Sequence, residues 1–435
     1  MPYKKSGTPF LYDSVTNDIV GIVDPDGSEK FFPLTGQPSP SAASGVLYAA
    51  LSASRANAPY RGPISLASGV TVTAGVVAPG VTEYRYWTGS NARYFKVFGL
   101  GASVFFEQYA TTYLRAKCAR TADATYQNGV GGWAAQIRFT GQTVTFSVVG
   151  STVNYIVLVN GKPTNTAGYN QASAGRIEVN CGSSGDWEIT LVMRQDHALM
   201  GVFADGQLHA QPDVTGIKVL YIGDSFCAST TSPASTISDQ GYAAQLRLQT
   251  GFDVDTLAHG IGSSGYQTGN LLTNAWRPAD AAAVNPDLIV LPFGTNDIGG
   301  GATEATVKTG VAAGVSAIKA ACPNAKVLVL GPWPKSLNLS ATLLNTESWI
   351  SQTCGSIGVP FYPINTAGAA LPGGGTLTNP WVWGDGDTNT AETVAGNSKW
   401  VTGDDGTHPS PAFGAAYLAA RTIDAVLDTC KKLGW

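Results

Sequence analysis

Three residues of this chain have the side chains and the spacing needed for acyl transfer: Ser225, Asp405 and His408. Ser225 ends a Gly-Asp-Ser turn directly after the apolar run 219–222, and Asp405 precedes His408 by three residues. A serine hydrolase needs a hydroxyl nucleophile, an imidazole that takes its proton and a carboxylate that orients the imidazole. One tight loop can hold Asp405 against the His408 ring, whereas the adjacent Asp404 is expected to point away. We therefore predict Ser225 as the nucleophile, His408 as the general acid and base, and Asp405 as its orienting carboxylate.

Hydrogen-bond donors for a developing oxyanion follow two other apolar runs. Asn296 lies in a Gly-Thr-Asn-Asp segment after the run 288–293, and Gly265 lies in the glycine-rich segment 259–266. Glycines let a backbone approach a substrate closely, and preorganised donors stabilise the charge that forms on a carbonyl oxygen during attack. We predict an oxyanion hole made of the Ser225 N–H, the Gly265 N–H and the Asn296 side-chain amide.

Alternating strands and helices from residue 214 onward must position these groups. Strands are predicted at 217–222, 254–258, 288–293, 326–330 and 360–362, and helices at 241–250, 303–321, 340–357 and 411–433. Ser410, followed by Pro411, is the expected N-cap of the last helix. This alternation predicts a parallel sheet with helices on both faces, whose carboxyl edge carries the chemistry.

The part before residue 214 has a different pattern. Residues 67–213 hold short β-type segments at intervals of roughly ten residues, which is typical of a sandwich or jelly roll. The dipeptide Asn160-Gly161 between two of them signals a tight turn. Residues 1–35 predict a small N-terminal β element, and residues 36–66, rich in Pro, Ser and Ala, are predicted to be a linker.

In its C-terminal part the chain resembles the SGNH hydrolases of the GDSL lipase/esterase superfamily. The resemblance covers about residues 214–435 and rests on four segments in the family's order: 223–225, the Gly265 segment, 294–297 and 405–408. It implies a flavodoxin-like three-layer α/β/α domain with a five-stranded parallel sheet, preceded here by the all-β module. It also implies the roles given above to Ser225, Asp405 and His408, with no metal and no other cofactor.

One of the four segments departs from the family's pattern. Many members have Asn ahead of the glycine of the second segment, whereas this chain has His259-Gly260-Ile261-Gly262. The departure leaves the register of that glycine open by three residues, with Gly262 as the alternative to Gly265. His259 is the one other histidine that we single out for a test of substrate contact.

The composition describes a folded, turn-rich protein without a strongly charged partner. Of 435 residues, 44% are hydrophobic and 13% are charged, and the formal net charge is -4. No Lys/Arg cluster exceeds a pair, so neither nucleic acid nor an anionic membrane is an expected partner. No secretory signal and no membrane-spanning stretch is predicted. The six cysteines form no CxxC pair, which favours free buried thiols over a zinc site, with a Cys322–Cys354 bridge as the alternative.

Tryptophans near the predicted active-site edge favour a carbohydrate ester. Trp381 and Trp383 lie in the long loop 365–403, and Trp333 follows the fourth strand. Because sugar rings stack on indole faces, we predict these three residues as substrate-binding. The alternative is that they pin a glycine-rich loop to the domain. No long apolar lid helix is predicted, which counts against a lipase.

Two weaker resemblances concern the N-terminal part. Residues 139–145 and 157–162 resemble the jelly-roll domain that precedes the hydrolase domain in some acetylated-sugar esterases, although a spacer or trimerisation scaffold is an equal alternative. Residues 11–27 are similar to attachment segments of bacteriophage virion proteins. This similarity implies a tail fibre or spike protein that is assembled in the host cytoplasm, attached through its N-terminal segment, and homotrimeric.

Together these features predict a serine esterase that removes O-acetyl groups from a bacterial surface polysaccharide through an acetyl-enzyme. Two alternatives stay open. A lipase or thioesterase of the same superfamily would prefer long acyl chains, and a glycan-binding virion protein without catalysis would hydrolyse no ester.

Overall fold

The chain forms two compact units. The first includes Gly62–Ala119 and Gly132–Thr215, and the second includes Pro38–Arg61 and Gly216–Trp435. The computed structural model describes residues 3–4, 10–12, 19–23, 29–31, 45–57, 67–74, 81–85, 93–98, 104–109, 111–116, 133–149, 153–165, 169–171, 175–193, 198–211, 217–227, 231, 241–250, 255–260, 265–267, 272, 276–299, 301–334, 339–384, 396–411 and 413–435.

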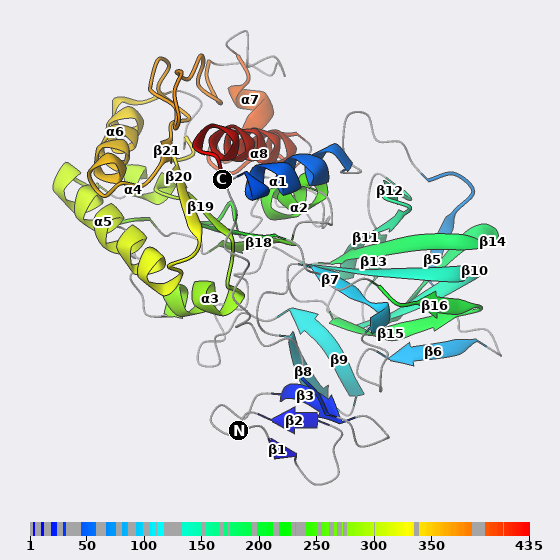
Figure 1. Ribbon diagram of the computed structural model, residues 1–435. Coiled ribbons are helices and arrows are strands. Elements are labelled where there is room, and N and C mark those ends of the chain that lie inside the picture. Colours follow the sequence, from blue (N-terminus) through cyan, green and yellow to red (C-terminus); the bar gives the residue numbers. More distant parts are fainter. Residues whose placement is uncertain are drawn as a thin grey trace. The chain divides into compact units, whose positions relative to one another are not determined.

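A five-stranded parallel sheet forms the centre of the second unit (Figure 1). Its strands are β17 (Lys218–Gly223), β18 (Asp255–Gly260), β19 (Leu288–Pro292), β20 (Lys326–Leu330) and β21 (Phe361–Tyr362). They lie in the order β18-β17-β19-β20-β21, and all neighbours are parallel. The predicted parallel sheet is therefore confirmed. Because β17 lies between β18 and β19, the loops that follow these three strands meet at one edge of the sheet.

Apolar side chains alternate between the two faces of this sheet, as the pleat of a strand requires. Val219 and Tyr221 belong to one hydrophobic cluster, and Leu220 and Ile222 belong to another. The first cluster includes side chains of α1 (Val46–Asn57), α2 (Tyr242–Thr250) and α8 (Gly414–Leu433), and the second includes side chains of α3 (Trp276–Val284), α5 (Glu304–Ala321) and α6 (Ala341–Ser356). Helices thus cover both faces, and the unit has three layers.

Side-chain caps fix the starts of two predicted helices. The Thr303 hydroxyl accepts a hydrogen bond from the Thr306 N–H at the start of α5. The Ser340 hydroxyl does the same for the Leu343 N–H at the start of α6. Each cap satisfies an N–H group that has no partner within its helix. Both helices begin where the sequence predicted.

The last helix begins later than predicted. Helix α8 starts at Gly414 rather than at residue 411. The Ser410 N–H donates to the Val401 carbonyl at 2.8 Å, and an isolated bridge joins Thr402 to Pro409. These bonds keep the chain extended through Ser410. The prediction of Ser410 as the N-cap is therefore wrong, because the N-cap is Phe413. The Ser410 hydroxyl still contributes at the helix start, where it accepts from the Gly414 N–H at 2.8 Å.

The predicted linker 36–66 contains a helix, so that prediction is wrong for residues 46–57. Helix α1 buries Leu47 and Leu51, which are 0% and 2% exposed, in the same cluster as α8. The Tyr48 N–H also donates to the Trp435 carbonyl at 3.0 Å. The apolar residues recur at helical spacing, but the low-complexity sequence before them concealed the pattern. Helix α1 belongs to the second unit although it lies between segments of the first unit in sequence.

Glu347 on α6 is a buried carboxylate that holds the start of the long loop after β21. It is 2% exposed, and its Oε1 accepts hydrogen bonds from the N–H groups of Ile364 and Asn365 at 2.8 and 2.9 Å. Its Oε2 accepts from the Thr366 hydroxyl at 2.6 Å. The carboxylate thus satisfies several donors at once. Its removal would leave these donors buried and without an acceptor.

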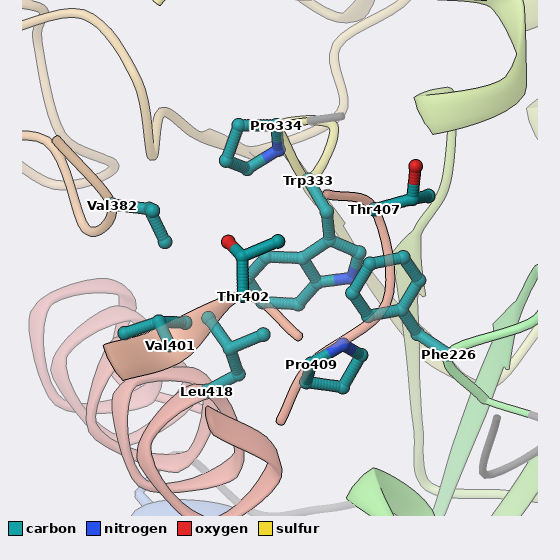
Figure 2. Close-up of a pocket in the computed structure, with 9 residues that line it drawn as sticks. All are labelled: Phe226, Trp333, Pro334, Val382, Val401, Thr402, Thr407, Pro409 and Leu418. Carbon is teal, nitrogen blue, oxygen red and sulfur yellow. The ribbon is translucent and has the colours of Figure 1, made fainter. Parts of the chain in front are cut away.

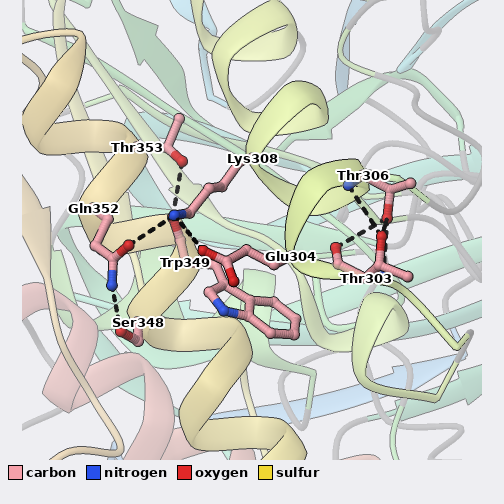
Figure 3. A network of polar contacts seen from close by, with 8 residues as sticks. All are labelled: Thr303, Glu304, Thr306, Lys308, Ser348, Trp349, Gln352 and Thr353. Carbon is pink, nitrogen blue, oxygen red and sulfur yellow. Dashed lines mark hydrogen bonds and ion pairs between the residues drawn. The ribbon is translucent and has the colours of Figure 1, made fainter.

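Replacing Glu347 with alanine should lower the free energy of unfolding by about 3–5 kcal/mol, because each abandoned buried donor costs about 1–3 kcal/mol. Denaturant unfolding measures the change. Glu304→Ala is a matched control on a neighbouring helix. Glu304 pairs with Lys308 at 2.5 Å, and Lys308 reaches Gln352 of α6, in the surface network of Figure 3. Such an exposed pair contributes at most about 1 kcal/mol. Equal losses for the two variants would contradict the role given to Glu347.

The first unit is built on two long antiparallel strands, β10 (Trp133–Val149) and β14 (Gly175–Met193). The two strands pair along most of their length, with a register shift between Gly141 and Thr143. They belong to a twelve-stranded sheet, whose other members are β5 (Thr71–Ala74), β6 (Thr82–Arg85), β7 (Lys96–Phe98), β8 (Val104–Tyr109), β9 (Thr111–Ala116), β11 (Val153–Val159), β12 (Lys162–Pro163), β13 (Tyr169–Gln171), β15 (Ala198–Ala204) and β16 (Gln207–His209).

The tight turn predicted at Asn160-Gly161 is confirmed. The two residues have φ values of 49° and 74°, and they join β11 to β12 with Val159 paired to Lys162. A two-residue hairpin turn of type I′ requires a positive φ at both of these positions. The N-terminal β element also exists, as a four-stranded antiparallel sheet of β1 (Tyr3–Lys4), β2 (Phe10–Tyr12), β3 (Ile19–Val23) and β4 (Glu29–Phe31). The jelly-roll arrangement of the larger sheet stays a prediction.

In the described part of the chain, no helix combines the length and the apolar character needed to cross a bilayer.

The five cysteines that the structure describes are free and buried: Cys181, Cys227, Cys322, Cys354 and Cys430. The Cys322–Cys354 bridge is therefore excluded. Burial raises the pKa of Cys354 to about 12 and that of Cys322 to about 11, so these thiols are protonated and unreactive at neutral pH.

Candidate active site

Ser225 lies in a tight turn directly after β17. A Cβ atom on Gly223 would lie 2.6 Å from the Cys227 sulfur and 2.9 Å from the Pro292 carbonyl oxygen, so only glycine fits there. The Asp224 carboxylate is fully buried, and its Oδ1 accepts from the Phe226 N–H at 3.1 Å. These contacts hold the turn between β17 and β19 and leave the half-buried Ser225 at the carboxyl edge of the sheet.

The loop before α8 brings His408 to Ser225. The His408 Nε2 lies 2.9 Å from the Ser225 Oγ, and its Nδ1 lies 2.6 Å from Oδ2 of Asp405. A neutral ring that carries its proton on Nδ1 donates to Asp405 and accepts from the serine hydroxyl. The structure therefore brings the three predicted residues together in the order that nucleophilic catalysis requires.

Asp405 is held in this geometry by its own loop. Its Oδ1 accepts from the N–H groups of Thr407 and His408, both at 2.9 Å. Burial acts to raise the pKa of Asp405, but the hydrogen bonds from the His408 ring and from these two N–H groups outweigh it and hold the pKa below its ordinary value. The carboxylate therefore stays ionised at neutral pH, and it can stabilise a positive charge on the imidazole.

The predicted oxyanion donors lie after the two strands beside β17. Asn296 is the second residue of α4 (Thr295–Gly299), which follows β19 directly. Gly265 is buried and packs on Asp297, the residue after Asn296. The alternative glycine, Gly262, lies outside the described residues, as does the side chain of His259 on β18. The roles of Ser225, Gly265 and Asn296 in binding an oxyanion stay predictions.

Two of the three predicted substrate-binding tryptophans are core residues. Trp333 and Trp381 are 0% and 1% exposed, and their rings pack on each other with centroids 5.5 Å apart. Their burial rules them out as an open platform for a sugar ring, so the prediction is corrected for both; they pin loops to the domain, which was the alternative. Trp383 is half-buried, and its backbone N–H donates to Oδ1 of Asn397 at 2.9 Å. Its contact with substrate stays a prediction.

Phe226 is a residue near the site that sequence reasoning missed. Its ring lies 5.8 Å from the His408 ring and stacks on Trp333, also at 5.8 Å. Phe226, Trp333 and the two neighbours of His408, Thr407 and Pro409, line a small pocket (Figure 2). The signal available in the sequence was only its place after the nucleophile. The Phe226 ring therefore packs between Trp333 and the imidazole that receives the serine proton.

No group of His, Cys, Asp and Glu among the described residues is arranged to hold a metal ion. The groups that the structure brings together are the Ser225 hydroxyl, the His408 imidazole and the Asp405 carboxylate. This arrangement can open an ester by nucleophilic attack, hold the acyl group on Ser225 and release it to water.

Residues 221–415 match the GDSL-like Lipase/Acylhydrolase family. The matched segment contains Ser225, Asp405 and His408 and most of the parallel sheet. Within the second unit, the chain is therefore similar to this family over the segment that holds the three predicted catalytic residues. No curated protein sequence matches the chain.

Solved structures with a similar fold extend beyond this domain. A family two carbohydrate esterase from Cellvibrio japonicus has 13% identity and a TM-score of 0.52, over 84% of this chain and 99% of that one. The salicylyl-acyltransferase SsfX3 from a tetracycline biosynthetic pathway has 14% identity and a TM-score of 0.56, over 81% and 99%. The acetyl xylan esterase Est2A from the rumen bacterium Butyrivibrio proteoclasticus has 14% identity and a TM-score of 0.50, over 81% and 98%. At these identities the likeness concerns the fold alone.

Proposed function

We propose that this protein is a serine esterase that removes O-acetyl groups from a bacterial surface polysaccharide. The observation that carries the proposal is the chain of contacts from Ser225 through His408 to Asp405, with distances of 2.9 and 2.6 Å. A hydroxyl, an imidazole and an ionised carboxylate in this order activate a nucleophile without a cofactor.

The reaction proceeds through an acetyl-enzyme. Ser225 Oγ attacks the acetyl carbonyl carbon while His408 Nε2 takes the hydroxyl proton, and the oxyanion is bound by the N–H groups of Ser225 and Gly265 and by the Asn296 amide. His408 then gives its proton to the departing sugar oxygen. Water, deprotonated by His408, releases acetate and restores the Ser225 hydroxyl.

The proposed substrate is an acetylated glycan. This substrate is supported by the fold shared with a family two carbohydrate esterase and an acetyl xylan esterase, and by the half-buried Trp383 in the long loop. The proposal further places the chain in a phage tail fibre or spike, as a homotrimer attached through its N-terminal β element. Its support is the similarity of residues 11–27 to virion attachment segments.

The test is acetate release by the purified chain. We expect hydrolysis of p-nitrophenyl acetate in preference to p-nitrophenyl octanoate, and release of acetate from at least one member of a panel of native capsular and O-antigen polysaccharides. Preference for the octanoate would favour a lipase or thioesterase. Binding to a polysaccharide without hydrolysis of any ester would favour a non-catalytic glycan-binding protein.

A further inference from the structure

We propose that Asp297 is a positioning residue that ties the Gly265 segment to the Asn296 segment and thereby fixes the two predicted oxyanion donors relative to each other. The inference rests on the proposed esterase function. Asp297 acts through the backbone next to Gly265 and has no assigned contact with substrate.

The Asp297 carboxylate binds two consecutive N–H groups that follow Gly265. Its Oδ2 accepts from the Tyr266 N–H at 2.7 Å, and its Oδ1 accepts from the Gln267 N–H at 3.0 Å. Asp297 is 1% exposed. Hydrogen bonds to an ionised acceptor are stronger than neutral ones, and burial shields them from water. The carboxylate therefore holds the backbone of this segment from both of its oxygens.

Gly265 itself lies directly against the same carboxylate. A Cβ atom at this position would lie 2.4 Å from Oδ1, 2.6 Å from Cγ and 2.6 Å from Oδ2 of Asp297. No side chain can occupy that space unless the carboxylate or the segment moves. The close approach explains why glycine is needed at 265, independently of any contact with substrate.

The segment around Asn296 is also held by hydrogen bonds and by packing. The Asp297 N–H donates to the Gly294 carbonyl at 3.1 Å. The hydroxyl of Thr295 accepts from the backbone N–H of Trp333 at 3.0 Å. The Tyr266 ring packs edge-on against Phe293 with centroids 5.1 Å apart. Residues 265–267 and the start of α4 are thus joined by hydrogen bonds into one piece that carries both predicted donors.

We expect Asp297→Ala to lower kcat for p-nitrophenyl acetate by about 10²–10³-fold, the loss seen when one oxyanion donor is removed. KM should change less than about threefold, because the ground-state carbonyl depends little on these donors. Asp297→Asn should lose less, because one acceptor oxygen remains. A kcat of Asp297→Ala within about threefold of the wild type would overturn the proposal.

Asp205, which is exposed, provides a control for the bonding pattern in the first unit. Its Oδ1 and Oδ2 accept from the N–H groups of Gln142 and Thr143 at 3.0 and 2.9 Å, the same pattern of two consecutive donors. Asp205→Ala should leave kcat unchanged. If it lowers kcat as much as Asp297→Ala does, the effect of Asp297 is general destabilisation and the proposal fails.

A double substitution separates positioning from stability. Gly265→Ala should be nearly inactive, because its Cβ displaces the carboxylate. Gly265→Ala combined with Asp297→Ala should retain a kcat close to that of Asp297→Ala alone, because the obstruction is gone. Losses that multiply would show that the two residues act independently and would overturn the proposal.

Hydrogen exchange tests the link even if the wild-type chain hydrolyses no ester, in which case only the proposed function fails. The amides of Tyr266 and Gln267 should exchange at least about tenfold faster in Asp297→Ala than in the wild type, and at an unchanged rate in Asp205→Ala. Unchanged exchange in Asp297→Ala would overturn the proposal.

Discussion

Replacing Ser225 with alanine should lower kcat for p-nitrophenyl acetate by about 10⁴-fold or more, because the attacking oxygen is lost and His408 has no hydroxyl to deprotonate. In serine hydrolases the removal of the nucleophile leaves only the smaller acceleration that binding and the oxyanion donors supply. Initial rates at saturating ester measure kcat. The initial burst of p-nitrophenol that reports the acetyl-enzyme should disappear in the same variant.

Ser340→Ala is the matched control for this variant. Ser340 caps α6 through the Leu343 N–H at 3.1 Å and lies in no part of the proposed site. Its loss should cost about 1 kcal/mol of stability and leave kcat unchanged. A Ser225→Ala chain that still releases acetate at a tenth of the wild-type rate would exclude Ser225 as the nucleophile.

Replacing Asp405 with asparagine should lower kcat by roughly 10²–10⁴-fold. The carboxylate accepts from His408 Nδ1 at 2.6 Å, whereas an amide can present its NH₂ group there and favour the wrong ring tautomer. A loss of about 10⁴-fold is known for the corresponding change in a triad protease. KM should stay close to the wild-type value, since Asp405 is not predicted to contact the ester.

Asp404→Asn is the control for this second variant, because it removes the same charge from the neighbouring, exposed position. It should keep the wild-type kcat. If Asp404→Asn loses more activity than Asp405→Asn, the orienting carboxylate has been assigned to the wrong residue.

The same carboxylate gives the loop a defined pH dependence. The pKa of Asp405 is lower in the folded protein than its ordinary value of about 3.9. Its contribution to stability is therefore complete above the unfolded pKa and is lost as the pH falls through the folded pKa. The stability difference between the wild type and Asp405→Asn should thus shrink on acidification below pH ~4.

The sequence allowed the sheet and the Ser225 turn to be predicted because both depend on local patterns. Buried parallel strands such as β17 and β19 are continuous apolar runs, and a strand that ends in Gly-Asp-Ser must turn sharply. Asp405 and His408 lie three residues apart, so their contact requires only one loop. These features need no knowledge of distant parts of the chain.

Features that depend on distant contacts could not be predicted in this way. Trp333 and Trp381 lie 48 positions apart, and only the packing of their rings against each other shows that they belong to the core. The hydrogen bonds of Asp297 reach back about 30 positions to Tyr266 and Gln267. Residue types near an active-site edge predict which groups are available, while burial decides which of them meet the substrate.

The pairing of α1 with the C-terminal end bears on how the chain is made. Gly45 and Tyr48 donate to the carbonyls of Gly434 and Trp435, so the first helix of the hydrolase unit meets its partner only after Trp435 has been synthesised. At about 5–20 residues per second, translation of the intervening roughly 380 residues takes about 20–80 s. Until then, Leu47 and Leu51 lack the part of their hydrophobic cluster that α8 supplies. The second unit therefore closes around α1 only once α8 has been made, and a chain that stops before α8 lacks this contact.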